Sequence, residues 1–195
     1  MGFKPCPVRK NSGEIFLCVD FWNVNRASDK YSYPMLFMDH ILQIVCWAHM
    51  FSLLDSSSGY NQVLVVEPNR LKTILHTKWG TFTYIQMPFG LVNAGATFQH
   101  TMDIAFCGLI GQSVVVYLDD VTLFSIRWED HIRHLKKNFE WCRRYGISLN
   151  PKKSVFFMSE GNLLRHLVAK SGIKVDSDQF KAITCIPHLI NKKAM

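Results

Sequence analysis

The chain has 195 residues, of which 48% are hydrophobic and 19% are charged. A chain of this length and apolar content can form one domain with its own core, so a mainly disordered state is excluded. Lys and Arg number 22 against 15 Asp and Glu, giving a net charge of +7. That balance suits a polyanion such as nucleic acid, and it suits an ordinary basic surface equally well.

The cysteines and the N-terminus indicate an intracellular protein. The six cysteines are irregularly spaced without a Cys-x-x-Cys pair, so we expect reduced, mostly buried thiols. Residues 1–5 lack the apolar core of a signal peptide. The apolar stretch 35–54 is interrupted by polar residues such as Asp39 and Gln43, which argues against a membrane span. We expect no membrane partner and a cytoplasmic location, with the nucleus as the alternative.

The first third of the chain predicts a hairpin, a loop and a helix. Residues 6–9 and 15–21 are β-favouring and flank a turn at Gly13, so we expect two paired strands. The polar stretch 25–34 indicates a loop, and the apolar spacing of 35–45 indicates a helix.

Short strands and one helix follow. Phe51 begins a strand that ends at the carboxylate Asp55. Pro88 and Gly90 break the pattern before the helix begins. The expected strands are 51–55, 62–66, 73–77 and 82–86, and the expected helix is 94–106.

The tetrad Tyr-Leu-Asp-Asp at 117–120 lies between the apolar runs 114–116 and 121–124. This pattern predicts a β-hairpin with Asp119 and Asp120 at its tip. Carboxylates at such a tip can bind hard divalent cations. Asp also favours turns for local hydrogen-bonding reasons, so the tetrad alone favours the structural interpretation.

The segment 128–145 predicts the clearest helix. Apolar residues recur at three- and four-residue steps, acidic residues stand in the first turn and basic residues in the last, and Gly146 follows. Its basic face can be solvated or can contact nucleic acid. A strand within 148–157 and a hairpin at 163–175 come next. Hairpins and helices mixed irregularly predict an α+β fold with a three- or four-stranded antiparallel sheet backed by helices.

Neighbouring strands can bring Asp55 and Asp119 together in a basic protein. Carboxylates that bridge two divalent ions about 3.5–4 Å apart are what metal-assisted nucleotide transfer requires. This is the chemical hypothesis that the residues support.

Several short sequence motifs support the hypothesis of metal-assisted nucleotide transfer. Through these motifs the chain resembles the reverse transcriptase of Gypsy-type long-terminal-repeat retrotransposons and their retroviral relatives. The similarity extends over about residues 8–193. The blocks are Cys-Val-Asp-Phe at 18–21, Phe-Ser-Leu-Leu-Asp at 51–55, Ser-Gly-Tyr at 58–60, Met-Pro-Phe-Gly-Leu at 87–91, Ala-Thr-Phe-Gln at 96–99, Val-Val-Val-Tyr-Leu-Asp-Asp at 114–120 and Leu-Asn-Pro-Lys-Lys at 149–153.

The resemblance implies a right-hand polymerase fold with a ferredoxin-like palm sheet. It implies fingers from residues 1–30 and 63–93, a palm from 31–62 and 94–168, and the start of a truncated thumb at 169–195. No acidic cluster of ribonuclease H type follows, so we do not expect that activity in this chain.

The resemblance also implies site residues. Catalytic and metal-binding residues are Asp55, Asp119 and Asp120, holding two Mg²⁺ ions, with Mn²⁺ as the substitute. Nucleotide-binding residues are Lys10, Tyr60, Phe89 and Gly90, with Tyr60 as the gate against a ribose 2′-hydroxyl. Without that context Tyr60 would be interpreted as a core aromatic. Template and primer contacts are Gln99, Leu164, Arg165 and His166, whereas Lys152 and Lys153 would contact phosphates or solvent.

Some positions depart from the family pattern. Phe16 stands where relatives carry an Arg on the triphosphate, so a bidentate clamp is missing. Trp22 and Ser57 also replace family arginines, and Gly95 replaces a proline. Arg165 replaces the glycine of a Leu-Gly-His motif near the primer end.

Three interpretations remain open. The first is an RNA-directed DNA polymerase domain of a retrotransposon polyprotein, impaired in this chain, which uses an RNA template, a DNA primer and deoxynucleoside triphosphates. The second is an inactive nucleic-acid-binding remnant. The third is a remnant that folds only beside other polypeptides. Connection, ribonuclease H and integrase domains of a polyprotein are the expected protein partners.

Overall fold

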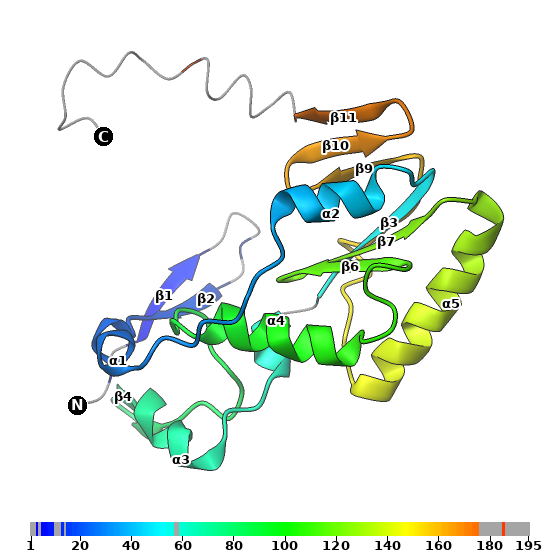
Figure 1. Ribbon diagram of the computed structural model, residues 1–195. Helices are drawn as coiled ribbons and strands as arrows, with labels where there is room; N and C mark the ends of the chain where they lie inside the picture. The colour runs from blue at the N-terminus through cyan, green and yellow to red at the C-terminus, as the bar shows by residue number, and fades with distance from the viewer. Residues whose placement is uncertain are drawn as a thin grey trace.

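A computed structural model describes Phe3, residues 5–9, Gly13, residues 15–56 and 59–175, and Cys185 (Figure 1). The fold is α+β, as expected. None of the helices in the part of the chain that the structure describes is both long enough and apolar enough to cross a membrane.

A four-stranded antiparallel sheet forms the centre, in the order β6-β7-β3-β8. Its strands are β3 (Met50–Asp55), β6 (Val114–Tyr117), β7 (Asp120–Ser125) and β8 (Val155–Met158). The central hairpin and the strand ending at Asp55 are therefore confirmed. Most of β7 and β6 is buried, because both faces of the sheet are covered, and this explains their continuous apolar runs.

The two faces of the sheet support two hydrophobic cores. On one face, α4 (Ala94–Ala105) and α5 (Trp128–Tyr145) pack over Leu54, Val116 and Leu123. On the other face, α2 (Met38–Val45) and the strands β9 (Glu160–Leu163) and β10 (His166–Ala169) pack over Phe51 and Phe124. Figure 1 shows α5 along one side of the sheet and α2 on the side of β9–β11.

Helix α5 begins and ends where the sequence predicts. Gly146 ends it with a left-handed φ of 68°, which a residue without Cβ adopts without strain. The buried face differs from the apolar spacing, however. His131 and Asn138 are fully buried while Ile132 is 55% exposed, because the helix directs a polar network at the sheet.

The strands β9 (Glu160–Leu163), β10 (His166–Ala169) and β11 (Gly172–Val175) form a separate antiparallel sheet. The expected hairpin at 163–175 is thus part of a three-stranded unit. Leu164 and Arg165 make its first turn with φ of 49° and 65°.

The N-terminal part contains two small two-stranded sheets. One pairs β1 (Pro5–Arg9) with β2 (Ile15–Val19), and the other pairs β4 (Leu75–Thr77) with β5 (Gly80–Phe82). A helix α1 (Trp22–Ala27) follows β2.

Three sequence-based expectations are wrong. The strand expected at 82–86 is absent, because the observed strand is Gly80–Phe82 and Gln86 makes only an isolated bridge. Residues 25–34 are not all loop, since α1 runs to Ala27. Residues 62–66 form no strand and contribute one bridge, between Leu64 and Gln86. This stretch joins the short helix η1 (Gly59–Gln62) to the short helices α3 (Glu67–Arg70) and η2 (Leu71–Thr73). Leu64 is 65% exposed, so its apolar neighbours do not mark a buried strand face.

The cysteines are free but not mostly buried. Cys142 is buried and Cys46 is half-buried, while the exposed ones are Cys6, Cys18, Cys107 and Cys185. Burial raises the pKa of the Cys142 thiol to about 11.

Candidate active site

The carboxylates of Asp55, Asp119 and Asp120 come from adjacent strand ends. Asp55 and Asp120 are directly opposed in the β3–β7 register, so their side chains lie on the same face of the sheet. The Ser56 amide donates to the Asp119 carbonyl oxygen at 3.1 Å. The structure therefore brings together the three acids that the sequence predicts as a site.

The Asp119 side chain sits in a close cradle. Its Oδ1 is buried and has no hydrogen-bond partner among the described residues. A Cβ added to Gly59 would collide with this Oδ1 and would come within 3.0 Å of Phe98 Cζ. Only glycine at position 59 leaves room for the carboxylate.

The pKa values of Asp119 and Asp120 are both raised. Burial raises the pKa of Asp119, and the charges of Asp120 and Asp55 raise it further, against an opposing effect of Lys153. Desolvation and then the Asp55 charge raise the pKa of Asp120, again opposed by Lys153. Because Asp120 is exposed, solvent screens its shift. A positive ion at this place would favour the charged form of the carboxylates.

Lys153 already supplies a positive charge. Its Nζ lies 3.5 Å from Asp55 Oδ2, although sequence analysis assigned it to phosphates or solvent. The Asn150 amide donates to the Asp55 carbonyl at 2.8 Å and holds this loop against β3. The pairing of residues 149–153 with the end of β3 has no signal in the sequence, which is why this partner was missed.

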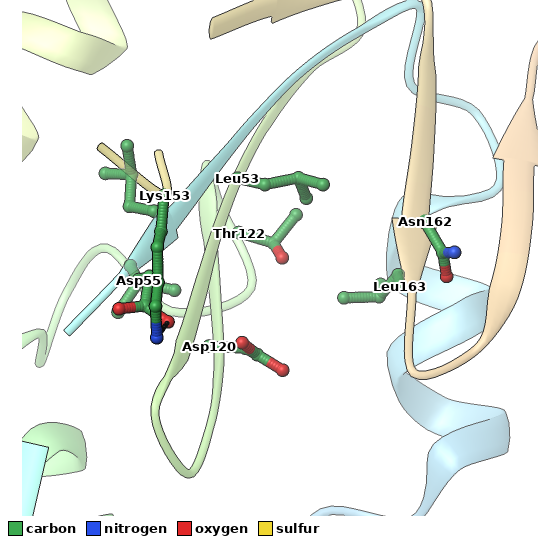
Figure 2. Close-up of a pocket in the computed structure, with 9 residues that line it drawn as sticks. Leu53, Asp55, Asp120, Thr122, Lys153, Asn162 and Leu163 are labelled. Atoms are coloured by element: carbon green, nitrogen blue, oxygen red, sulfur yellow. Dashed lines mark hydrogen bonds and ion pairs between the residues drawn. The ribbon is translucent and has the colours of Figure 1, made fainter. Parts of the chain in front are cut away.

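A small pocket of about 180 Å³ opens beside the acids, between the central sheet and β9. Figure 2 shows Lys153 beside Asp55, with Asp120 turned away from that pair. The lining residues are Leu53, Leu54, Asp55, Asp120, Val121, Thr122, Lys153, Asn162 and Leu163.

The donor set suits a hard cation. Carboxylate oxygens are the ligands that Mg²⁺ prefers, and Asp119 Oδ1 lacks a partner among the described residues. Within residues 15–56 and 59–175, however, no three His, Cys, Asp or Glu side chains stand close enough to enclose an ion as they are. The chemistry fits, and the carboxylates must turn toward one another to share an ion.

Gln99 holds the turn that carries Asp119. Its side chain is 1% exposed; Oε1 accepts from the Leu118 amide at 2.8 Å, and Nε2 donates to the Val116 carbonyl at 3.2 Å. Leu118 has a left-handed φ of 52°. Contact of Gln99 with a template stays a prediction, and in the structure its amide supports the turn.

Aromatic rings border the acids. Tyr60 packs 4.9 Å from Phe89 and 5.4 Å from Phe98, measured between ring centroids. Phe16 meets the edge of Phe89 at 5.8 Å. Burial and the nearby Asp119 charge raise the pKa of Tyr60. Of the predicted nucleotide residues, Tyr60 therefore lies near Asp119, and Phe89 packs against Tyr60.

The loop around Gly90 is also fixed. Gly90 has a φ of 95°, which favours glycine. Its carbonyl accepts from Asn25 Nδ2 at 2.8 Å, and Asn25 Oδ1 accepts from the Val92 amide at 2.8 Å. The start of α1 is thereby attached to the loop before α4.

The remaining predicted site residues lie elsewhere. Leu164, Arg165 and His166 make the β9–β10 turn, next to Leu163 of the pocket. Lys10 and Ser57 lie outside the described residues.

Comparison with known proteins identifies the family. Residues 11–183 match the family model described as reverse transcriptase (RNA-dependent DNA polymerase). The chain is 33% identical over 171 residues to the retrovirus-related Pol polyprotein from transposon gypsy of Drosophila melanogaster, covering 88% of this chain and 16% of that protein. It is 31% identical over 183 residues to the enzymatic polyprotein of Cauliflower mosaic virus (strain Strasbourg), covering 94% and 26%.

Solved structures share the fold. A foamy viral protease-reverse transcriptase in complex with double-stranded DNA superimposes with a TM-score of 0.86 at 21% identity, covering 100% of this chain and 40% of that one. The same kind of protein in complex with an RNA/DNA hybrid gives 0.82 at 20% identity, covering 97% and 25%. The chain spans 16% of the length of the gypsy polyprotein. From the matched family and the retrotransposon relatives, this chain belongs to the reverse transcriptase family, as a reverse transcriptase domain of the retrotransposon Pol type.

Proposed function

We propose that the chain is an RNA-directed DNA polymerase domain that transfers nucleotides to a primer 3′-hydroxyl with two divalent metal ions, at reduced efficiency. The observation that carries this proposal is the convergence of Asp55, Asp119 and Asp120 at one end of β3 and β7. An unpartnered carboxylate oxygen on Asp119 adds to it.

Asp55, Asp119 and Asp120 would hold the ions, Mg²⁺ or Mn²⁺. When bound, such ions lower the pKa of an attacking hydroxyl and stabilise a leaving pyrophosphate. The chain's own part is to keep the carboxylates in place. The β3–β7 ladder fixes Asp55 opposite Asp120, and Gly59 leaves space for Asp119.

Tyr60, Phe89 and Gly90 would border the incoming nucleotide, with Tyr60 against the sugar where a 2′-hydroxyl would clash. Support comes from the packing of Tyr60 on Phe89 and its proximity to Asp119. Lys10 would approach the triphosphate. Gln99, Leu164, Arg165 and His166 would face template and primer.

We assign residues 1–30 and 63–93 to the fingers, 31–62 and 94–168 to the palm, and 169–195 to the start of a thumb. The two small N-terminal sheets and the central sheet with its helices fit this division. The cytoplasmic location stays a prediction.

An RNA template, a DNA primer and deoxynucleoside triphosphates are the proposed substrates. The net charge of +7 supports a polyanionic partner. Since the chain covers only part of its relatives, connection, ribonuclease H and integrase domains of a polyprotein are proposed partners.

Reduced efficiency follows from two substitutions. Phe16 packs against Phe89 where an Arg would bind the triphosphate, and an aromatic ring cannot replace bidentate hydrogen bonds. Arg165 adopts a φ of 65°, which places a long charged side chain at a turn that glycine would make without strain.

Primer extension tests the proposal. We expect Mg²⁺-dependent extension of a DNA primer on an RNA template, weak but abolished by Asp119→Asn. The alternative is an inactive protein that still binds nucleic acid, and Phe16 in place of the triphosphate-binding Arg favours it. It predicts no extension by either chain and template binding that weakens as salt rises.

A further inference from the structure

A chain of hydrogen bonds runs from the loop before α2 to the turn that carries Asp119. Tyr33 Oη donates to Asp103 Oδ2 at 2.7 Å. Asp103 Oδ1 accepts from Gln99 Nε2 at 2.9 Å, and Gln99 Oε1 accepts from the Leu118 amide. We infer that Tyr33 and Asp103 are positioning residues for the catalytic turn, an inference that rests on the proposed polymerase function.

The series of hydrogen bonds ends at Leu118, whose backbone is strained. Leu118 is not glycine, yet its φ is 52°, a left-handed conformation that is unfavourable for a residue with a Cβ. Asp119 is the next residue, so the orientation of the Leu118 peptide sets the direction of the Asp119 carboxylate. The bond from the Leu118 amide to Gln99 offsets part of that strain.

Asp103 and the Val116 carbonyl together set which way the Gln99 amide faces, since both accept from its Nε2. A carboxylate accepts hydrogen bonds and does not donate them. Oδ1 of Asp103 can therefore pair only with the NH₂ end of Gln99, which turns Oε1 toward the Leu118 amide. A neutral amide in place of Asp103 is a weaker acceptor, so it would hold the NH₂ end of Gln99 less firmly and leave the Val116 carbonyl as the remaining acceptor that keeps Oε1 on the Leu118 amide.

Tyr33 fixes the other oxygen of Asp103. The hydrogen bond to Asp103, followed by burial, raises the pKa of Tyr33 to about 12, so this hydroxyl remains a donor. The ring also stacks on His100 at a centroid distance of 4.6 Å. Removal of the hydroxyl alone would leave that stacking in place.

The same loop contains a matched control. Tyr31 Oη pairs with His100 Nδ1 at 2.8 Å and also sits near the Tyr33 ring. Among the residues that the structure describes, its hydroxyl forms no hydrogen bond with Gln99 or Asp103. Tyr31→Phe and Tyr33→Phe therefore each delete one hydroxyl from the loop that packs beside α4. Only Tyr33→Phe removes a hydrogen bond of the series that leads through Asp103 and Gln99 to Leu118.

The first readout is amide hydrogen exchange by NMR on the ¹⁵N-leucine-labelled chain, with the Leu118 signal assigned through Leu118→Met. We expect protection of the Leu118 amide to fall about tenfold in Asp103→Asn and about threefold in Tyr33→Phe, the losses typical of a hydrogen bond. Tyr31→Phe should leave it unchanged. Equal protection in all chains, or an equal loss in both tyrosine variants, would overturn the inference.

The second readout is Tb³⁺ binding by luminescence together with primer extension. Asp103→Asn should weaken Tb³⁺ binding severalfold and lower kcat with little change in KM for the nucleotide, because the turn is displaced and the nucleotide pocket is not. Loss of Leu118 protection with unchanged Tb³⁺ binding and kcat would contradict the positioning role. If the parent chain neither binds Tb³⁺ nor extends a primer while the protection differences persist, the proposed function fails and the structural path stands.

Discussion

In β7 every residue after Asp120 is buried, whereas in the hairpin β1–β2 every residue is exposed or half-buried. The central sheet carries the carboxylates between two cores. The N-terminal hairpin carries Phe16, which makes an edge contact with Phe89, a proposed nucleotide residue. Isolated two-stranded sheets are marginally stable in water, so the two regions should differ in local stability.

The difference in burial between the central sheet and the N-terminal hairpin suits two proposed roles, holding the carboxylates and contacting the nucleotide. The catalytic turn is held by buried contacts that tolerate little change, and Gly59 and Gln99 are examples. The β1–β2 hairpin, which we propose faces the nucleotide, is exposed or half-buried throughout and so has room for substitution. We expect mutations near the acids to affect stability and activity together, and mutations in the hairpin to affect substrate binding alone.

Gly59→Ala should have the largest effect. The added Cβ would collide with Asp119 Oδ1, so primer extension should fall about a hundredfold and the free energy of unfolding by about 1–3 kcal/mol. Gly95→Ala is the control, because its Cβ would meet Leu118 Cδ2 at an ordinary 3.7 Å. It should gain about 0.4–1 kcal/mol in α4. Parent-like extension by Gly59→Ala would show that Asp119 is not confined.

A buried polar network should make the central sheet pH-sensitive. His131 is fully buried; its Nε2 pairs with Ser52 and its Nδ1 with Ser125, both at 2.8 Å. Burial, then the charge of His134, lowers the pKa of His131. The pKa of His134 is also lowered, by burial and then by Arg133, with Lys137 acting in the same direction and Asp130 opposing.

Because both histidine pKa values are lowered, the folded state should lose stability as the pH decreases. Below the ordinary histidine pKa of 6.5, the unfolded chain takes up protons that the folded chain does not, so stability is complete above that pH and falls as pH decreases. Denaturant titrations at pH 5.5 and 7.5 measure it. A free energy of unfolding that is equal or higher at pH 5.5 would contradict the neutral, buried state of the histidines.

Ser52→Ala should cost about 1–3 kcal/mol, because it leaves His131 Nε2 and the Phe157 amide without their partner. Ser56→Ala is the matched control on the same segment. Its Oγ is buried and has no partner among the described residues, so its removal should be neutral or stabilising. Equal losses in both variants would place the cost in packing and not in hydrogen bonding.

Phe16→Arg should act on substrate binding alone. A guanidinium at this position can bind the triphosphate in bidentate fashion, so KM for the nucleotide should fall about tenfold, as expected for a charge-assisted hydrogen bond. Phe16→Lys, which adds charge without the planar fork, should gain less. Steady-state extension measures both, and an unchanged KM would remove the clamp argument.

Arg165→Gly should have the smallest effect, a gain of about 1 kcal/mol from relief of the left-handed conformation. Leu164 has a similar φ of 49°, but its side chain packs against the second core. Leu164→Gly should therefore gain less or lose stability. Thermal unfolding compares the two variants.

The sequence predicts the central elements because burial there agrees with local pattern. The apolar runs around 117–120, the caps of α5 and the strand ending at Asp55 all appear where expected. It fails where the chain is exposed: Leu64 and Val66 look like strand residues, but they are 65% and 62% exposed and the helix α3 starts at Glu67. The local sequence pattern predicts secondary structure poorly where no hydrophobic core buries one face of the segment.

The site is predicted in part for the same reason. The three acids stand in recognisable blocks, and the β3–β7 register joins them. Lys153, Asp103 and Tyr33 reach the site through tertiary contacts whose register is not written in the sequence. The buried His131, which shares the buried face of α5 with Leu135 and Cys142, was also missed. A polar residue at this spacing from apolar ones is a signal that could have indicated a network.

The most direct measurement is anomalous diffraction from Mn²⁺ in crystals of the chain grown with primer, template and an incoming nucleotide. The account predicts two Mn²⁺ peaks about 3.5–4 Å apart, contacted by the carboxylates of Asp55 and Asp119, with Lys153 displaced from Asp55. Peaks elsewhere, or no peak while the Lys153–Asp55 pair persists with bound nucleotide, would contradict the claim that these acids are the catalytic centre.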